Sequence, residues 1–339
     1  MNVGQQRIGL SRRGFLVGTG GALLAFAAAC SSSDGDGDGS GTGSEPSGPV
    51  IAHKYGETQV PTDPQRIVSV GYNDQDTILA LGGTLAGTFD WYGDYPYGVW
   101  PWAQDLLGDA QPEIVGTAST NIDFEKVATV APDLVVGTYS GLTQAQYDKL
   151  SAIAPTVAQP KEFADYGVPW QDQTRILGET LGKKDKAAQL VSSVETQFDD
   201  VRAANPAFAG KTVLVGALKG PGQFGVYGPE DPKVRFFTEL GFVNPAVTEQ
   251  ITGNFAEIST EQLSLANVDL LVWYAGGGYG DKLRAELDKT PIYQELDVVK
   301  AGRTITLEDA AAEAMAWSTV LSLPYALNEI PPRVAPLLV

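Results

Sequence analysis

The chain has 339 residues, a formal net charge of −18 at pH 7, one histidine and one cysteine. A protein this acidic lacks the clustered Lys and Arg that nucleic acids require, and its charge opposes binding to anionic lipid surfaces. Because His53 is the only histidine and Cys30 the only cysteine, the composition argues against a zinc enzyme, a histidine-based metal site or an intrachain disulfide. We expect no resident cofactor and no direct metal ligand, and we place His53 at the surface or at a strand edge.

The first thirty residues have the pattern of an export signal with a lipid attachment site. Arg12 and Arg13 lie in a Ser-Arg-Arg-Gly-Phe-Leu segment that resembles a twin-arginine export signal. Residues 14–29 are apolar but fall short of the roughly 20 residues that span a membrane. Ala-Ala-Ala before Cys30 resembles a lipobox, so Cys30 is expected to carry acyl chains and to anchor the protein to the outer face of the cell membrane. The alternative is a soluble secreted protein cut nearby.

Residues 30–49 are rich in Gly, Asp, Ser and Pro, a composition typical of a flexible tether. The remaining chain is longer than one hydrophobic core usually supports, so we expect two lobes. Short β-branched runs alternate with helical patterns, such as residues 76–81 before Gly82, which predicts an α/β fold with largely parallel sheets. The expected strands are residues 67–70, 134–136, 212–215, 270–273 and 304–307.

An internal repeat indicates that the two lobes are similar. Residues 122–136 contain Ile-x-x-Glu-x-Val followed by Pro-Asp-Leu-Val-Val. Residues 258–272 repeat this without a gap as Ile-x-x-Glu-x-Leu followed by Val-Asp-Leu-Leu-Val. Upstream, the second copy carries an insertion over residues 219–228.

One long helix is predicted between the lobes, over residues 184–205. Its apolar residues recur at intervals of three and four and form one stripe, and Asn205-Pro206 ends the helix. At 1.5 Å per residue it spans roughly 33 Å, enough to run along both lobes. The lobes therefore comprise residues 50–183 and 206–339. The stripe consists of Ala187, Leu190, Val191, Val194, Phe198 and Val201.

Several segments, in this order, resemble the ferric-siderophore and cobalamin class of ABC-transporter substrate-binding proteins. They are Arg66-Ile-Val-Ser-Val, Asp76-x-x-Leu-Ala-Leu-Gly, Asp123-Phe-Glu-Lys-Val, Leu177-Gly-Glu and Leu240-Gly-Phe. The aromatic stretch over residues 90–102 is similar to the actinobacterial iron-siderophore branch. The resemblance implies a class III periplasmic-binding-protein fold, a monomer that holds its ligand in the cleft between two lobes with little hinge motion. It also implies delivery of the ligand to an ABC permease, with no chemistry on the ligand and with iron arriving as a chelate.

Ligands of open α/β sheets bind beyond the carboxyl ends of the strands, and aromatic residues gather at these ends. Six of them fall within residues 91–102, among Gly, Pro and Asp, so we expect a cleft with aromatic walls and hydroxyl and indole donors. The predicted ligand-binding residues are Tyr72, Asn73, Trp91, Tyr92, Tyr95, Trp100, Trp102, Tyr139, Trp170, Lys219, Tyr227, Trp273, Tyr274 and Trp317.

Charge narrows the expected ligand. Lys219 is the one basic residue in this set, whereas a tris-catecholate iron complex carries about three negative charges and needs several cations. A neutral ferric hydroxamate or a mycobactin-like siderophore therefore fits better. Haem, with a tyrosine on its iron, and cobalamin stay open as alternatives. A secreted hydrolase and a structural surface lipoprotein are the remaining, less favoured readings, because no catalytic constellation emerges.

The resemblance also implies that one acidic residue per lobe docks on the permease, near the start of the helix that follows the lobe's first strand. In the first lobe this position corresponds to Asp76. In the second lobe the equivalent position is Arg235, so either Glu230 or Asp231 is expected to supply the acid.

Overall fold

The computed structural model describes residues 48–339 apart from residues 94, 119–120, 249–250 and 252–253. Contacts divide the chain into two units, residues 1–43 and residues 44–339, and all elements named below belong to the second. The predicted export signal and Cys30 lie outside the described residues, as does the predicted tether except for its last two residues. None of the helices in the described part is both long and apolar enough to cross a bilayer.

The first lobe is built on a six-stranded sheet. Its strand order is β6-β5-β4-β3-β7-β8, and every neighbouring pair is parallel except β5 with β6. An antiparallel pair, β1 with β2, precedes this sheet in the chain. The strands are β1 (Val50–His53), β2 (Gly56–Gln59), β3 (Ile67–Ser69), β4 (Leu85–Asp90), β5 (Glu113–Thr117), β6 (Asn121–Ile122), β7 (Leu134–Val136) and β8 (Thr156–Val157).

The second lobe has a five-stranded sheet in the order β11-β10-β9-β12-β13. Strands β9, β12 and β13 are parallel, as predicted, and β10 is antiparallel to both of its neighbours. The predicted insertion contains the last two residues of β9, the turn and all of β10. The sequence did not predict a strand at β10. The strands are β9 (Val213–Gly220), β10 (Gln223–Tyr227), β11 (Phe255–Ile258), β12 (Leu270–Tyr274) and β13 (Thr304–Leu307).

Helices of the first lobe begin and end at residues suited to these positions. Asp123 accepts hydrogen bonds from the backbone N–H groups of α2, and Thr143 forms a capping box with Gln146 at the start of α3. Gly82 ends α1 with φ +86°, a conformation that glycine adopts without strain. The helices are α1 (Asp74–Leu81), α2 (Phe124–Thr129), α3 (Gln144–Ser151) and α4 (Trp170–Thr180), with 3₁₀ turns η1 (Pro96–Gly98) and η2 (Gln104–Leu107).

In the second lobe, Asp231 caps α6 and Pro232 occupies its first position, a combination that pre-forms the first turn. The helices are α6 (Pro232–Glu239), α7 (Gly280–Asp288), α8 (Pro291–Gln294), α9 (Asp297–Lys300), α10 (Ala310–Trp317), α11 (Ser322–Glu329) and α12 (Pro331–Val334), with 3₁₀ turns η3 (Pro206–Phe208), η5 (Glu261–Ala266) and η6 (Ala335–Leu338).

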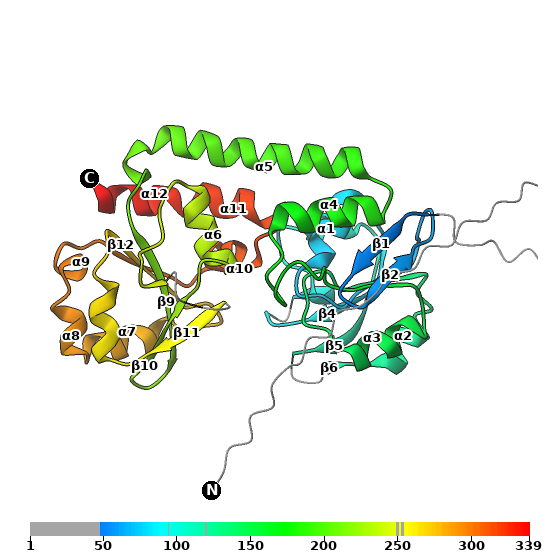
Figure 1. Cartoon of the computed structure of the whole chain (residues 1–339), viewed down its shortest axis with the longest axis horizontal. Helices are drawn as coiled ribbons and strands as arrows, with labels where there is room; N and C mark the ends of the chain where they lie inside the picture. Colours follow the sequence, from blue (N-terminus) through cyan, green and yellow to red (C-terminus); the bar gives the residue numbers. More distant parts are fainter. Residues whose placement is uncertain (1–47, 94, 119–120, 249–250, 252–253) are drawn as a thin grey trace, which may run out of the picture. The chain divides into compact units, whose positions relative to one another are not determined.

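The long helix predicted between the lobes is present as α5 (Lys184–Ala204). Figure 1 shows it running from the first lobe to the second, and it contacts α11 along the way. Ala187 packs into a core of the first lobe, while Val194 and Phe198 pack into a core that contains the α6 phenylalanines. The predicted apolar stripe therefore contacts the hydrophobic cores of both lobes.

The internal repeat corresponds to the same elements in both lobes. Residues 122–136 span the end of β6, α2 and β7, and residues 258–272 span the end of β11, η5 and much of β12. The expectation for His53 is confirmed in part. His53 is the last residue of β1, a strand that pairs only with β2 in the described part of the chain, but it is not a surface residue: it is 2% exposed, and its Nε2 lies 2.9 Å from Thr58 Oγ1. Burial lowers the pKa of His53, so the ring is neutral at pH 7.

Candidate functional site

Aromatic side chains from both lobes meet where β3, β4 and α10 end. The ring of Trp317, at the end of α10, lies 4.7 Å from Tyr72 and 5.7 Å from Tyr92, centroid to centroid. Trp100 lies 5.1 Å from the same ring. Since Tyr72 follows β3 and Tyr92 follows β4, the carboxyl ends of two neighbouring strands supply the first-lobe side of this cluster.

A cavity of about 320 Å³ opens beside this cluster. Residues of both lobes form its walls, so this cavity lies where the ligand cleft was predicted. The indole N–H of Trp91 donates to the carbonyl of Gly71 at 3.1 Å, which fixes the ring at the wall. The lining residues are Tyr72, Trp91, Tyr139, Tyr166, Asp231, Pro232, Lys233, Asn254 and Ala316.

A chain of hydroxyl groups leads from Tyr72 to a buried carboxylate. The Tyr72 hydroxyl donates to the Tyr92 oxygen at 3.0 Å, and Tyr92 donates to Glu313 Oε2 at 2.9 Å. Tyr274 donates to the same Oε2, also at 2.9 Å. Burial raises the pKa of Tyr72 to about 12 and raises the pKa of Tyr92 and Tyr274 as well, so all three phenols are protonated at pH 7.

The cavity's basic residue is Lys233 rather than the predicted Lys219. Its Nζ lies 3.0 Å from Asp231 Oδ1 and 4.1 Å from the centre of the Tyr227 ring. Burial lowers the pKa of Lys233, but attraction to Asp231 and Tyr227 together with the hydrogen bond to Asp231 outweighs this and raises the pKa to about 12. The ammonium is therefore charged but already neutralised by its own carboxylate. Lys219 instead pairs with Glu257 at 3.6 Å, with about half of its side chain exposed.

Two predicted tryptophans are structural. Trp273 is 1% exposed and packs in the second-lobe core against Phe224 and Tyr293, with ring centroids 5.7 and 6.0 Å away. Trp170 is 4% exposed at the start of α4, where its indole N–H donates to Glu239 Oε1 at 3.1 Å. Neither side chain lines the cavity, and their assignment to ligand binding is corrected.

The other predicted residues surround the aromatic cluster without lining the cavity. Tyr95 and Trp102 flank Trp100, with ring centroids 4.7 and 5.1 Å from it. Tyr227 and Tyr274 lie 6.2 Å apart beneath the Lys233 ammonium.

Asn73 has a structural role between the lobes rather than a free amide for a ligand. It is 1% exposed, its Nδ2 donates to the Trp317 carbonyl, and its Oδ1 accepts from Gln173 at 2.8 Å. Next to it, Asp74 accepts from the backbone N–H of Thr138 at 2.9 Å and of Tyr139 at 3.2 Å. These bonds hold the start of α1 against the loop that carries Tyr139 to the cavity.

The prediction that Asp76 docks on the permease is wrong. Its side chain is fully buried, and its Oδ2 accepts from Trp102 Nε1 at 2.7 Å and from Thr319 Oγ1 at 2.8 Å. Burial raises the pKa of Asp76 to about 7, although hydrogen bonds from Trp102 and Thr319 oppose the shift. A carboxylate enclosed by both lobes cannot reach a permease.

One of the two second-lobe candidates, Asp231, also differs from the expectation. Asp231 is 5% exposed and is occupied as the cap of α6 and the partner of Lys233, so its docking assignment is wrong. Glu230 is exposed, and it forms an ion pair with Arg235, which in turn donates to the carbonyl of Gly167 in the first lobe at 3.0 Å. This pair ties the lobes together at the rim of the cavity.

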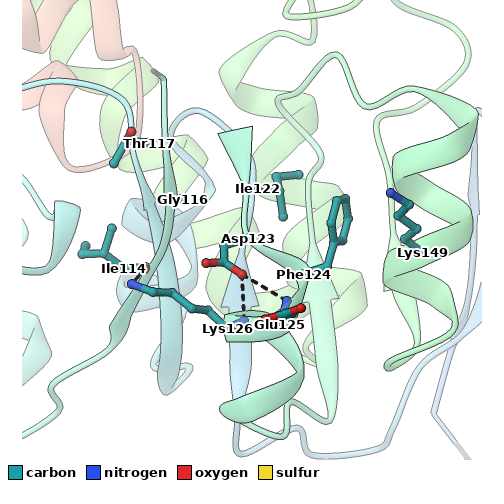
Figure 2. A pocket seen from close by; sticks show the side chains of 9 residues that line it. All are labelled: Ile114, Gly116, Thr117, Ile122, Asp123, Phe124, Glu125, Lys126 and Lys149. Atoms are coloured by element: carbon teal, nitrogen blue, oxygen red, sulfur yellow. Dashed lines mark hydrogen bonds between the residues drawn. The ribbon is translucent and has the colours of Figure 1, made fainter. Parts of the chain in front are cut away.

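A second and larger hollow, of about 790 Å³, lies on the first lobe beside the start of α2. Figure 2 shows Asp123 at the N-terminus of this helix, with Glu125 and Lys126 beside it and Phe124 toward Lys149. Glu125 is exposed there, and Glu261, its counterpart in the internal repeat, is exposed at the start of η5. The internal repeat therefore indicates one exposed acid in each lobe. These acids do not lie at the start of the helix after the first strand, where the docking residues were predicted.

Comparison with known proteins agrees with this architecture. The sequence profile of the periplasmic binding protein family matches residues 67–311. The ferric-anguibactin-binding protein FatB of Vibrio anguillarum is 28% identical over 292 residues, which cover 83% of this chain and 86% of FatB. The petrobactin-binding protein YclQ of Bacillus subtilis is 23% identical over 257 residues, which cover 75% of this chain and 77% of YclQ. A periplasmic solute binding protein from Mycobacterium smegmatis has a crystal structure that aligns with a TM-score of 0.76 and 33% identity, over 86% of this chain and 98% of that chain. The chain belongs to the periplasmic binding protein family.

Proposed function

We propose that this protein is the extracytoplasmic substrate-binding component of an ABC importer, that it captures a ferric siderophore, and that it performs no chemistry on it. The observation that carries the proposal is the cavity with walls from both lobes, whose first-lobe wall consists of tyrosine and tryptophan rings. Such walls suit a large, partly apolar chelate, and the hydroxyl groups supply direction. The names of two relatives support the ligand class, since one binds ferric anguibactin and the other petrobactin.

The charges around the cavity favour a neutral ferric hydroxamate or a mycobactin-like siderophore over a tris-catecholate. Lys233 is neutralised by Asp231 at 3.0 Å, and Glu313 adds a buried negative charge nearby. A trianionic complex would enter this site without free cations, which costs several kcal/mol. Haem and cobalamin are the alternative ligands of the same fold.

The test is a tryptophan-fluorescence titration of the protein with a neutral ferric trihydroxamate, a ferric mycobactin-type chelate, a ferric tris-catecholate, haem and cobalamin. We expect saturable quenching by one of the first two, with the tris-catecholate at least about tenfold weaker. Replacing Trp91, which lines the cavity, by alanine should weaken binding by about 1–3 kcal/mol. Tyr279→Ala is the matched control, because this ring is 52% exposed outside the cavity.

Two results would contradict the proposal. Turnover of a substrate without saturable quenching would make the protein an enzyme. Tighter binding of haem or cobalamin than of every ferric siderophore would transfer the site to that alternative ligand.

For the permease contact we propose Glu125 and Glu261 in place of Asp76 and Asp231. Both glutamates are exposed, occupy the same position in the internal repeat, and lie in the first turn of a helical segment in their own lobe. Hydrogen bonding to the backbone and to Ser259 lowers the pKa of Glu261, so it is fully ionised at pH 7. A pair of equivalent charges, one on each lobe, fits a permease that presents two equivalent basic residues.

Reversing the charge of either glutamate, as Glu125→Arg or Glu261→Arg, should reduce uptake of radioactive ferric siderophore into cells at least about tenfold, because a charge pair at an interface contributes on the order of 2 kcal/mol. Ligand affinity should stay within about twofold of the wild type, since neither residue lines the cavity. Glu162→Arg, an exposed acid outside the repeat, is the matched control. Uptake at the wild-type rate by both variants would remove Glu125 and Glu261 from the docking surface.

We propose that acyl chains on Cys30 anchor the protein to the outer face of the cell membrane. Cys30→Ala should release the protein from membranes into the soluble fraction, because acyl chains supply roughly 0.8 kcal/mol per buried CH₂ and a bare tether supplies none. Fractionation and immunoblotting after a salt wash measure this, with Ser31→Ala as the control. A Cys30→Ala protein that stays with the membrane would show that something other than this cysteine anchors it.

A further inference from the structure

Glu313 is a buried carboxylate without an ionic partner in the described part of the chain. It is 7% exposed on α10, and Oε1 accepts from the backbone N–H of Gly277 at 2.9 Å. Oε2 accepts from Tyr92 and from Tyr274, each at 2.9 Å. Since the carboxylate is held by neutral donors only, its negative charge is not cancelled locally.

Because of the direction of these hydrogen bonds, the three phenols and Glu313 have free acceptor positions for a ligand but no free donor. Tyr72 donates to Tyr92, and Tyr92 and Tyr274 donate to Glu313, so each phenol spends its single proton inside the chain. The phenol oxygens keep lone pairs, and a carboxylate has about four acceptor positions, of which Glu313 uses three. Toward a ligand, the group therefore offers lone pairs and negative charge, and it is complementary to a donor with positive charge.

The nearby cations do not change this balance. The Lys233 ammonium lies 5.2 Å from the centre of the Tyr274 ring, but Asp231 neutralises it at 3.0 Å. Arg235, at the rim, is paired with Glu230. Counting these two pairs as neutral leaves one negative charge at the site, that of Glu313.

The carboxylate is closed on one side, and on the other the hydroxyl groups of Tyr92 and Tyr72 connect it to the cavity, which Glu313 does not itself line. A side chain added at Gly276 would lie 2.4 Å from Glu313 Oε1 and 2.3 Å from the Tyr274 hydroxyl, so the loop after β12 covers this side tightly. Ala316, one helical turn after Glu313 on α10, lines the cavity together with Tyr72, the first hydroxyl of the chain. The acceptor of this group that a ligand in the cavity reaches first is therefore the Tyr72 oxygen.

We infer that the site takes ferric chelates that carry a pendant ammonium group, with the Tyr72 oxygen as its acceptor, the Glu313 carboxylate behind it through Tyr92, and the surrounding tyrosine and tryptophan rings as its walls; the inference rests on the proposed siderophore binding. Aromatic faces attract cations electrostatically when the cation lies within about 6 Å of the ring centre. The negative charge of Glu313, which the hydrogen-bonded hydroxyl groups connect to this acceptor, adds electrostatic attraction in a site of low dielectric constant. The same acceptors repel catecholate and carboxylate oxygens of a ligand.

The experiment compares two probes that share one iron centre, ferric ferrioxamine B, which ends in a primary ammonium, and its N-acetyl derivative, which is neutral. Affinities for the full chain are measured by tryptophan fluorescence at pH 7 and 0.15 M salt, where long-range effects of the −18 net charge are screened. We expect ferrioxamine B to bind at least about tenfold more tightly than the acetylated probe, and Glu313→Gln to reduce this ratio to about twofold or less.

The matched control is Glu329→Gln, which removes one exposed negative charge from the same lobe and should leave the ratio unchanged. Tyr274→Phe removes one neutral donor to Glu313 but keeps its charge, so less of that charge is offset and the preference for the ammonium should be at least as large as in the wild type; a smaller preference in this variant contradicts the inference even where Glu313→Gln fails to fold. Equal affinities in the wild type, tighter binding of the acetylated probe, or an unchanged ratio in Glu313→Gln would each overturn the inference. If the protein binds other ferric siderophores but neither probe, the inference is wrong and the proposed function stands. If no ferric siderophore binds, the proposed function itself is wrong.

Discussion

Replacing Trp273 by alanine should lower the free energy of unfolding by about 3–5 kcal/mol, as removal of a fully buried aromatic side chain usually does. The ring is 1% exposed and fills the second-lobe core between Phe224 and Tyr293. Its packing is tight on the strand side as well, because a side chain added at Gly216 would lie 2.7 Å from the indole. Urea unfolding followed by circular dichroism measures the effect.

The same variant should bind ferric siderophore with nearly wild-type affinity in its folded fraction, because Trp273 does not line the cavity. Tyr279→Ala, which removes an aromatic ring that is 52% exposed in the same lobe, is the stability control and should change the unfolding free energy by less than about 0.5 kcal/mol. A Trp273→Ala protein with unchanged stability and strongly weakened binding would return this residue to the ligand site.

Trp273 and Tyr274 show how far the sequence could predict the site. Side chains of adjacent strand residues point to opposite faces of a sheet, so only one of the two could face the aromatic cluster. Both are aromatic and both end the same apolar run, and the sequence therefore does not tell which face is which. The structure places Trp273 among core residues and Tyr274 on Glu313.

The fold was more predictable than the site because it depends on local patterns. The apolar stripe of α5 and the repeat over residues 122–136 and 258–272 follow from spacing within one segment, and the corresponding helix and strands are present. The site depends on contacts between distant segments. Lys233 lies in the first turn of α6, beside its cap Asp231, and lines the cavity. Lys219 lies in the β9–β10 hairpin, where it pairs with Glu257.

Asp76 illustrates the same limit. Its position near the start of α1, which corresponds to the docking position that the family resemblance implies, suggested an exposed acid. What buries it is Trp102, 26 residues later, and Thr319, 243 residues later. Neither contact leaves a trace in the local sequence around α1.

The burial of Asp76 between these partners makes stability depend on pH. The ordinary pKa of 3.8 is raised to about 7 in the folded chain, so between these values the folded state binds a proton that the unfolded state has lost. Stability from this group is therefore full below about pH 4 and is lost as the pH rises toward 7. The loss amounts to as much as about 4 kcal/mol, since one pKa unit corresponds to roughly 1.4 kcal/mol.

Asp76→Asn should remove this dependence, because the amide has the shape of the protonated acid and never ionises. We expect the unfolding free energy of the variant, relative to the wild type, to rise by about 3 kcal/mol between pH 4.5 and pH 8 in urea titrations. Taking the difference cancels other buried acids with raised pKa values, such as Asp74 and Glu239. Asp105→Asn, at an exposed acid in η2, is the control for the substitution itself. A constant difference for Asp76→Asn would mean that Asp76 stays ionised at its contact with Trp102 and Thr319, and that these two donors stabilise the charge more than burial penalises it.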